Sequence, residues 1–145
     1  MRLWNGWGNE DSDLTMELSD GLRALLEALV GSGTALSQAT LNEVIAKVPN
    51  TRLDDHPLIK TDPETRVRHA RGQSLPDWLE MHSGNVDTFP DGVAFPESSE
   101  QVRELLAHAK ENNLIVIPYG GGTSVVGHIN PETSDKPVLT IDMGK

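Results

Sequence analysis

The sequence contains no cysteine, few basic side chains and no long apolar run. Without thiols, disulfides, thiolate nucleophiles and cysteine-ligated zinc or iron–sulfur centres are excluded. The 12 Lys and Arg residues stand against 22 Asp and Glu residues, and this net charge of -10 argues against nucleic-acid partners, because such surfaces need clustered cations. No window approaches the ~18 apolar residues of a transmembrane segment. We therefore expect a soluble, cytoplasmic protein.

No metal site or nucleophile motif is evident. The histidines are irregularly spaced, and no two stand at the i, i+4 spacing of a helical metal site. Ser74, in GQSLP, lacks the second glycine of a nucleophile elbow because Pro76 stands in its place, so we interpret it as a helix cap. The sequence thus predicts no metal ligand and no catalytic residue.

The first half of the chain predicts helices. Leucines recur at helical spacing from Leu18 to Leu29 and end at Gly31, and we expect this stripe to join the core. Thr40 and Glu43 predict a capping box at the start of a second helix. Ser74 and Gly84 are placed to begin and end a third helix. Residues 49–73, which hold three prolines and mixed charges, predict an irregular connector.

Two groups of side chains in this half invite a binding interpretation. We expect Arg66, Arg68 and Arg71 to form ion pairs with carboxylates nearby in the sequence, which are Asp62, Glu64 or Asp77. For the tryptophans we favour packing between the N-terminal arm and the body, and they are Trp4, Trp7 and Trp78.

The second half reads strand, helix, strand, loop, strand. The strands are predicted at VAFP and at residues 114–118 and 138–142, and Ser98 with Gln101 predicts a capping box before the helix. A helical crossover of this length should make the first two strands parallel. The small sheet would have open edges, which indicates a truncated domain. We predict an α+β fold with an N-terminal arm and helices (1–88), followed by the incomplete first βαβ-type part of a larger domain (89–145).

The stretch PYGGGTSVVGH (118–128) places three glycines directly after a predicted core strand. It fails the dinucleotide fingerprint because Val125 stands where the last glycine should be, and it fails the P-loop motif because His128 and Ile129 replace Lys and Ser or Thr. Two interpretations remain. The glycine amides form a nest that binds an anion, with the Thr123 and Ser124 hydroxyls alongside, or the glycines only permit a tight turn.

Four blocks in this order resemble the FAD-linked oxidases of the PCMH-type, or vanillyl-alcohol-oxidase, fold. Within that family the resemblance is to the alkylglycerone-phosphate synthases and their bacterial relatives. The blocks are WNGWG (4–8), RHARGQSLPDWLEMHSG (68–84), PDGVAFPESSEQVRELLAHAKENNLIVI (90–117) and PYGGGTSVVGH (118–128).

The resemblance implies an FAD-dependent enzyme and assigns a cofactor loop. In the family this loop wraps the FAD pyrophosphate, so the implied cofactor contacts are Pro118, Tyr119, Gly120, Gly121, Gly122, Thr123 and Ser124. Gly127 would shape the end of the loop, and His128 stands where relatives usually have glycine. We expect noncovalent FAD. The catalytic residues are expected after Lys145. The full-length protein is expected to act on a small-molecule substrate, and whether it forms a homodimer stays open.

Three functions remain open. The resemblance favours a synthase that exchanges an acyl for an alkoxy group. An FAD-dependent D-2-hydroxyacid dehydrogenase of the D-lactate or glycolate type is the first alternative. The second is a non-enzymatic module whose glycine loop is only a turn.

Overall fold

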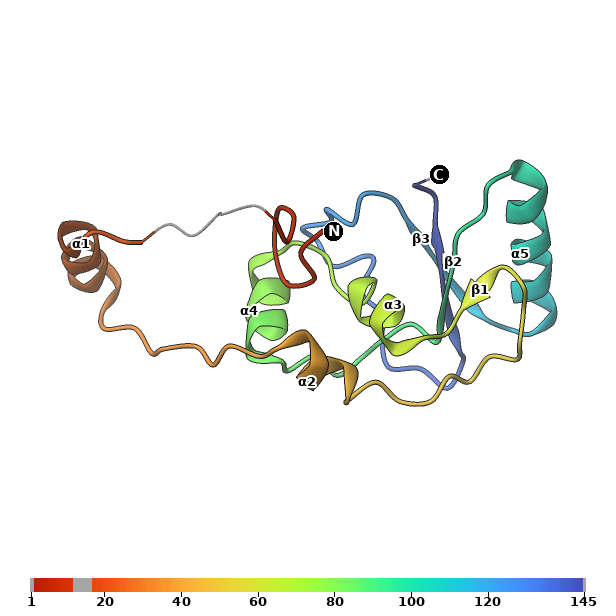
Figure 1. Ribbon diagram of the computed structural model, residues 1–145, viewed down its shortest axis with the longest axis horizontal. Coiled ribbons are helices and arrows are strands. Elements are labelled where there is room, and N and C mark those ends of the chain that lie inside the picture. Colours follow the sequence, from red (N-terminus) through yellow and green to blue (C-terminus); the bar gives the residue numbers. More distant parts are fainter. Residues whose placement is uncertain (1, 12–16, 145) are drawn as a thin grey trace.

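A computed structural model describes residues 2–11 and 17–144, and its architecture is α+β, as predicted. A four-stranded sheet at one end is joined to a group of short helices (Figure 1). The helices are α1 (Asp20–Val30), α2 (Leu41–Ile45), α3 (Pro63–Arg68), α4 (Leu75–Ser83) and α5 (Ser99–Glu111). The strands are β1 (Ile59–Lys60), β2 (Gly92–Ala94), β3 (Ile115–Tyr119) and β4 (Val138–Asp142).

The sheet has the strand order β1-β2-β4-β3. β4 pairs in parallel with both β2 and β3, whereas β1 pairs antiparallel with β2. The predicted parallel direction of β2 and β3 is therefore confirmed. They are not neighbours, however, because β4 lies between them. This arrangement brings the carboxyl ends of β3 and β4 together at one edge of the sheet.

The segment predicted as an irregular connector, residues 49–73, is partly ordered into β1 and α3. β1 has only two residues, which is too short to show an alternating pattern. α3 begins with Asp62, whose side chain accepts a hydrogen bond from the Thr65 amide, and has Pro63 in its first turn. These are ordinary helix-start signals. The prediction was wrong because it gave the mixed charges more weight than this Asp-Pro pair.

Alternating side chains cover the two faces of the sheet. On one face, Leu105 of α5 packs against Leu139 and Ile141 of β4. On the other face, Ile117 and Tyr119 of β3 pack with residues that include Val138 and Ile129. Leu105 and Leu139 are fully buried, so α5 is anchored on the sheet and fixes the direction in which β3 leaves the core.

A separate apolar cluster, the helical core cluster, joins α2, α3 and α4, with Val44, Val67 and Met81 at its centre. The predicted capping box at Thr40 is present, and Gly84 ends α4 as predicted, in the left-handed conformation. At α5, Ser98 caps the helix as expected, but the Gln101 side chain accepts from the Glu97 amide instead of that of Ser98. Local capping signals thus set the ends of these helices.

α1 stands apart from the body, and none of its residues is buried (Figure 1). The leucine stripe forms the predicted helix, with Ser19 as its N-cap and Gly31 as its C-cap. The expectation that this stripe joins the core was wrong, since Leu29 is 71% exposed and the other leucines are exposed as well. Among the described residues, no helix is long and apolar enough to cross a membrane.

Candidate functional site

The glycine loop begins where β3 ends, beside the carboxyl end of β4. The Tyr119 carbonyl accepts a hydrogen bond of 2.7 Å from the Met143 amide, so the two strand ends are held together. Ligands of open parallel sheets bind outside the carboxyl ends of the strands. The loop therefore lies at the edge of the sheet where a ligand is expected.

A hollow of about 230 Å³ lies over this loop. The seven residues assigned to the cofactor are close together, and six of them line the hollow: Pro118, Gly120, Gly121, Gly122, Thr123 and Ser124. Tyr119 instead points to the opposite side and is buried. Within the described part of the chain, the main-chain amides of residues 120–124 donate no hydrogen bond. Such free donors beside a hollow form a nest able to receive an anion.

The three glycines of the loop differ in how much space surrounds them. Gly122 has φ +67, and a Cβ there would overlap the Tyr119 hydroxyl and lie 2.5 Å from an Arg2 guanidinium nitrogen. Gly120 has open space where a Cβ would stand, and a Cβ on Gly121 would meet only Thr123, at 3.8 Å. No protein atom therefore requires glycine at 120 or 121, whereas a ligand that approaches the main chain closely would.

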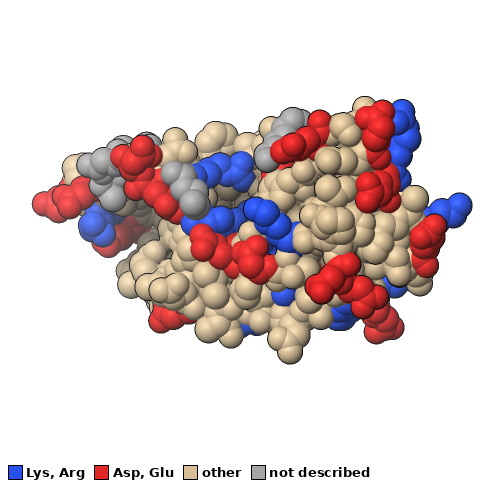
Figure 2. All heavy atoms as spheres, turned by 45° about the vertical axis from the view of Figure 1, so that its right-hand side comes forward, with Lys and Arg blue, Asp and Glu red and all other residues tan. Residues whose placement is uncertain are grey.

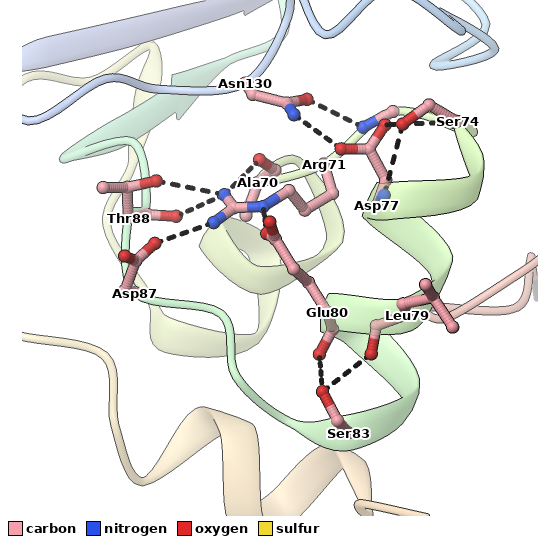
Figure 3. A network of polar contacts seen from close by, with 11 residues as sticks. Ala70, Arg71, Ser74, Asp77, Leu79, Glu80, Ser83, Asp87, Thr88 and Asn130 are labelled. Atoms are coloured by element: carbon pink, nitrogen blue, oxygen red, sulfur yellow. Dashed lines mark hydrogen bonds and ion pairs between the residues drawn. The ribbon is translucent and has the colours of Figure 1, made fainter. Parts of the chain in front are cut away.

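The loop is supported from behind by residues 72–77, which lead into α4 and form its first turn. The Gln73 amide donates to the Ser124 carbonyl at 2.6 Å. The Gly72 amide donates to Asn130, whose side-chain amide donates to Asp77 at 2.6 Å (Figure 3). Asp77 is buried and is also the partner of the N-cap residue Ser74 in the capping box of α4. The start of α4, Ser124 at the end of the glycine loop and Asn130 thus form one hydrogen-bonded unit.

Replacing Gly72 with alanine should shift this unit. A Cβ at position 72 would overlap the Ser124 carbonyl oxygen, which is a main-chain atom that cannot rotate away. We expect a loss of about 1–3 kcal/mol in the free energy of unfolding, as for other overpacked sites. Urea denaturation measures it, with Gly33→Ala as the control because a Cβ there meets nothing within 4 Å. Equal stability of the two variants would contradict the close contact.

Of the three carboxylates predicted as partners of the arginines, only Glu64 forms an ion pair with one of them. Arg71 is buried and binds Glu80, at 2.6 Å, and Asp87, while it also donates to the Thr88 carbonyl (Figure 3). The carboxylate of Asp77, the partner predicted from proximity in sequence, instead accepts from the Ser74 amide in the capping box of α4 and from Asn130. Arg71 thus ties α4 to the chain that leads into β2.

The other two arginines also serve the structure. Arg68 pairs with Glu64, as predicted, and with Glu10 of the N-terminal arm, both at 2.9 Å. Arg66 is 1% exposed and donates to the carbonyls of Pro49 and Pro90. Burial, the largest influence, lowers the pKa of Arg66 below its ordinary value, although the charge of Asp91 acts in the opposite direction.

The exit of the loop is shaped by Gly127 and His128. Gly127 has φ +73, and its carbonyl accepts from the Asn130 amide at 2.9 Å. The Nδ1 atom of His128 lies 3.0 Å from the Ser124 hydroxyl, and His128 lines the hollow. His128 therefore faces the same space as the glycine amides, where its imidazole can orient the Ser124 hydroxyl.

The tryptophans divide between packing and exposure. Trp4 and Trp78 pack against the helical core cluster, and the Trp78 indole donates to Gln73 at 2.7 Å. The packing of Trp4 agrees with the expected docking of the N-terminal arm on the body. Trp7 is 56% exposed, so the prediction was wrong for that residue.

Charges around the site are mixed. On the face drawn in Figure 2, Lys and Arg side chains gather in the middle of the molecule and are bordered by acidic side chains. No Lys or Arg lines the hollow over the glycine loop. In the described ranges, 2–11 and 17–144, no group of three or more His, Asp or Glu side chains could hold a metal ion. Binding at the hollow therefore depends on main-chain donors and hydroxyls.

Sequence reasoning missed the residues that hold the loop from behind. Gly72 and Arg2 are each far in sequence from the loop residues that they contact, and Asn130, which follows the loop, joins Gly72 to Asp77. Gly72 of the RHARGQS block was given no role of its own, although a glycine without an assigned turn is a signal of close approach. No pattern in the sequence marked Arg2.

Comparison with known proteins agrees with this geometry. Residues 90–145 match the family described as FAD binding domain. The alkyldihydroxyacetonephosphate synthase of Dictyostelium discoideum is 36% identical over 59% of this chain and 14% of its own length. The Caenorhabditis elegans synthase is 28% identical over 97% of this chain and 28% of its own length. The chain thus spans about a quarter or less of these relatives.

Structures and a second group of enzymes also match. A solved alkyldihydroxyacetonephosphate synthase has a TM-score of 0.75 and 25% identity, with 98% of this chain and 31% of the synthase covered. The mitochondrial D-lactate dehydrogenase [cytochrome] 1 of Saccharomyces cerevisiae is 32% identical over 47% of this chain and 11% of its own length. Residues 90–145 therefore belong to the family described as FAD binding domain, and over nearly its whole length the chain is similar to alkyldihydroxyacetonephosphate synthases.

Proposed function

We propose that the loop from Pro118 to Ser124 binds the pyrophosphate of noncovalent FAD. The observation that carries this proposal is the set of free main-chain amides, residues 120–124, beside a hollow of about 230 Å³. Direct amide donors act at short range, so the protein's net charge of -10 does not oppose them strongly at physiological salt, where screening acts within about 8 Å. The space where Cβ atoms would stand at Gly120 and Gly121 fits a ligand that lies on the main chain.

The whole protein, in our proposal, is an enzyme like the alkyldihydroxyacetonephosphate synthases. One of these synthases matches 97% of the chain, whereas the D-lactate dehydrogenases compared match 47% to 61% of it. FAD supplies the chemistry when bound, and the residues of this chain bind and orient it. We assign no catalytic residue among the 145 residues.

A D-lactate dehydrogenase-like activity is the second candidate, because such enzymes also match the chain. Whole-protein assays distinguish the two candidates: one measures exchange of the acyl group of an acylated dihydroxyacetone phosphate for a fatty alcohol, and the other measures reduction of a dye by D-lactate. The division into residues 1–88 and 89–145, a cytoplasmic location and a homodimer are further parts of the proposal.

Gly121→Asp tests the cofactor loop. A side chain at position 121 has room, so the variant should fold, but its carboxylate would repel the pyrophosphate. We expect affinity for FAD to fall at least about 100-fold, which corresponds to two tenfold steps of about 1.4 kcal/mol each. FAD titration of the purified whole protein, followed by flavin fluorescence, measures this, while circular dichroism checks the fold.

Gly33→Asp is the matched control, because it adds the same charge at a position where a Cβ meets nothing within 4 Å. It should bind FAD like the unchanged protein. A folded Gly121→Asp variant that retains FAD equally well would overturn the proposed site. Loss of fold at position 121 alone would favour the interpretation of the loop as a turn.

A further inference from the structure

The N-terminal arm, residues 2–10, is docked against the glycine loop. It folds back on itself, with the Leu3 amide donating to the Gly8 carbonyl at 3.0 Å. Arg68 of α3 holds it at two points, because its guanidinium donates to the Arg2 carbonyl and to the Glu10 carboxylate, both at 2.9 Å. Trp4 packs on the helical core cluster. Arg2 is thus presented to the loop by a fixed support.

The Arg2 guanidinium joins the glycine loop to the buried tyrosine beneath it. One nitrogen donates to the Gly121 carbonyl, and another donates to the Tyr119 hydroxyl at 2.7 Å. Burial raises the pKa of the Tyr119 hydroxyl, although the charge of Arg2 opposes this, so the hydroxyl remains protonated and accepts from Arg2 at neutral pH. The Tyr119 hydroxyl and the Arg2 guanidinium occupy the space where a Cβ on Gly122 would be, so the arm and the loop pack closely against one another.

We infer that Arg2 is a positioning residue for the cofactor loop, and this inference rests on the proposed binding of FAD. The peptide bond between Gly121 and Gly122 is trans, since the described residues contain no cis peptide. In a trans peptide the carbonyl and the amide point in opposite directions. A guanidinium that holds the Gly121 carbonyl therefore turns the Gly122 amide away from the arm. Gly121 and Gly122 line the hollow and Arg2 does not, so the amide is directed toward the ligand.

The same contact brings a positive charge behind the nest. Among the residues that line the hollow, none is Lys or Arg. A cation hydrogen-bonded to the carbonyl of a peptide polarises that peptide and strengthens its N–H as a donor, because hydrogen bonds in series reinforce one another. Arg2 thus acts on the pyrophosphate through the main chain. This role needs the forked guanidinium, which serves two acceptors at once, and the single ammonium of lysine is a poor substitute.

The variants Arg2→Gln and Arg2→Lys test this inference in the whole protein. We expect Arg2→Gln to weaken FAD binding about 10-fold to 100-fold and Arg2→Lys to weaken it about 10-fold, since lysine keeps the charge but loses the fork. The ligands are FAD, followed by flavin fluorescence, and inorganic pyrophosphate as its competitor. The competitor should lose affinity in parallel with FAD. Arg23→Gln, the same change on exposed α1, is the control and should leave both affinities unchanged.

A purely structural role for Arg2 would lower the melting temperature of the apoprotein without a separate effect on pyrophosphate. The inference is overturned if Arg2→Lys binds FAD like the unchanged protein, or if the losses of affinity only follow losses of folded protein. If Gly121→Asp abolishes FAD binding and the Arg2 variants do not weaken it, the cofactor site stands without this role. If neither change weakens binding, the proposed function itself fails.

Discussion

Replacing Gly122 with alanine should destabilise the protein and abolish FAD binding together. The residue has φ +67, a conformation that costs a side-chain-bearing residue about 1–2 kcal/mol. Its Cβ would also overlap the Tyr119 hydroxyl and stand 2.6 Å from the ring carbon that carries it. Tyr119 is 2% exposed and its ring cannot withdraw easily, so overpacking adds about 1–3 kcal/mol. We expect a total loss of about 2–5 kcal/mol in the free energy of unfolding, measured by urea denaturation.

Gly120→Ala is the matched control, because a Cβ at position 120 meets no protein atom within 4 Å. That variant should keep its stability. Its methyl group would nevertheless stand in the space proposed for the ligand, so FAD affinity should fall while the free energy of unfolding does not. If Gly122→Ala is as stable as Gly120→Ala, the close packing of Tyr119 and Arg2 beneath the loop is wrong.

Replacing Asp91 with asparagine should have the second large effect. Asp91 is 3% exposed and stands immediately before β2. Its carboxylate accepts a bidentate pair of bonds from Arg52, at 2.9 and 2.8 Å, and a third bond from the Val138 amide at 2.8 Å. Arg52 also donates to the carbonyls of Ser134 and Lys136, so this pair holds the chain that enters β4.

Asparagine keeps the shape but loses the negative charge that pairs with Arg52 and turns an N–H group toward one of the donors that Asp91 accepts from. Removing one partner of a buried pair costs about 3–5 kcal/mol, and because Arg52 is half-exposed we expect about 2–4 kcal/mol here. Urea denaturation at neutral pH measures the change. Asp54→Asn, on the exposed surface, is the control and should change little. A loss in Asp91→Asn no larger than that of the control would show that the pair does not hold the sheet.

The pH dependence of stability should identify the same carboxylate. Burial, the largest single influence, raises the pKa of Asp91, but the bonds from Arg52 and the Val138 amide outweigh it, so the folded pKa lies below the ordinary value. The unfolded chain titrates near 4. The stabilisation from Asp91 is therefore complete above about pH 4 and is lost as the pH falls through the lower folded pKa. Stability measured between pH 7 and pH 2 should decline less steeply in Asp91→Asn, and an unchanged profile would contradict this assignment.

Local features of the chain could be predicted because their causes are a few residues apart. Thr40 and Glu43 cap one another across three positions, and Gly84 ends α4 in the left-handed conformation that glycine adopts easily. The last strand was predicted with the bounds that it has, because five consecutive residues favour it. The amide nest was proposed from glycines that are adjacent in sequence.

Contacts between distant segments could not be predicted in this way. The leucines of α1 have the spacing of a buried face, yet spacing says only that the residues share a side of the helix and not whether another surface covers it. Arg71 pairs with Glu80 and Asp87 and not with Asp77, because the carboxylate of Asp77 accepts hydrogen bonds from Ser74 and Asn130. Such competition between partners is invisible in a linear pattern.

The sequence by itself determined the capped ends of several helices, the last strand, the resemblance to a family, and the run of glycines that fits a phosphate group. Tertiary structure decided that β4 lies between β2 and β3, and that Arg2 and Gly72 reach the glycine loop from segments about 50 or more positions away. The reason is physical: backbone preferences act over a few bonds, whereas a binding site needs donors whose direction is set by whatever packs behind them.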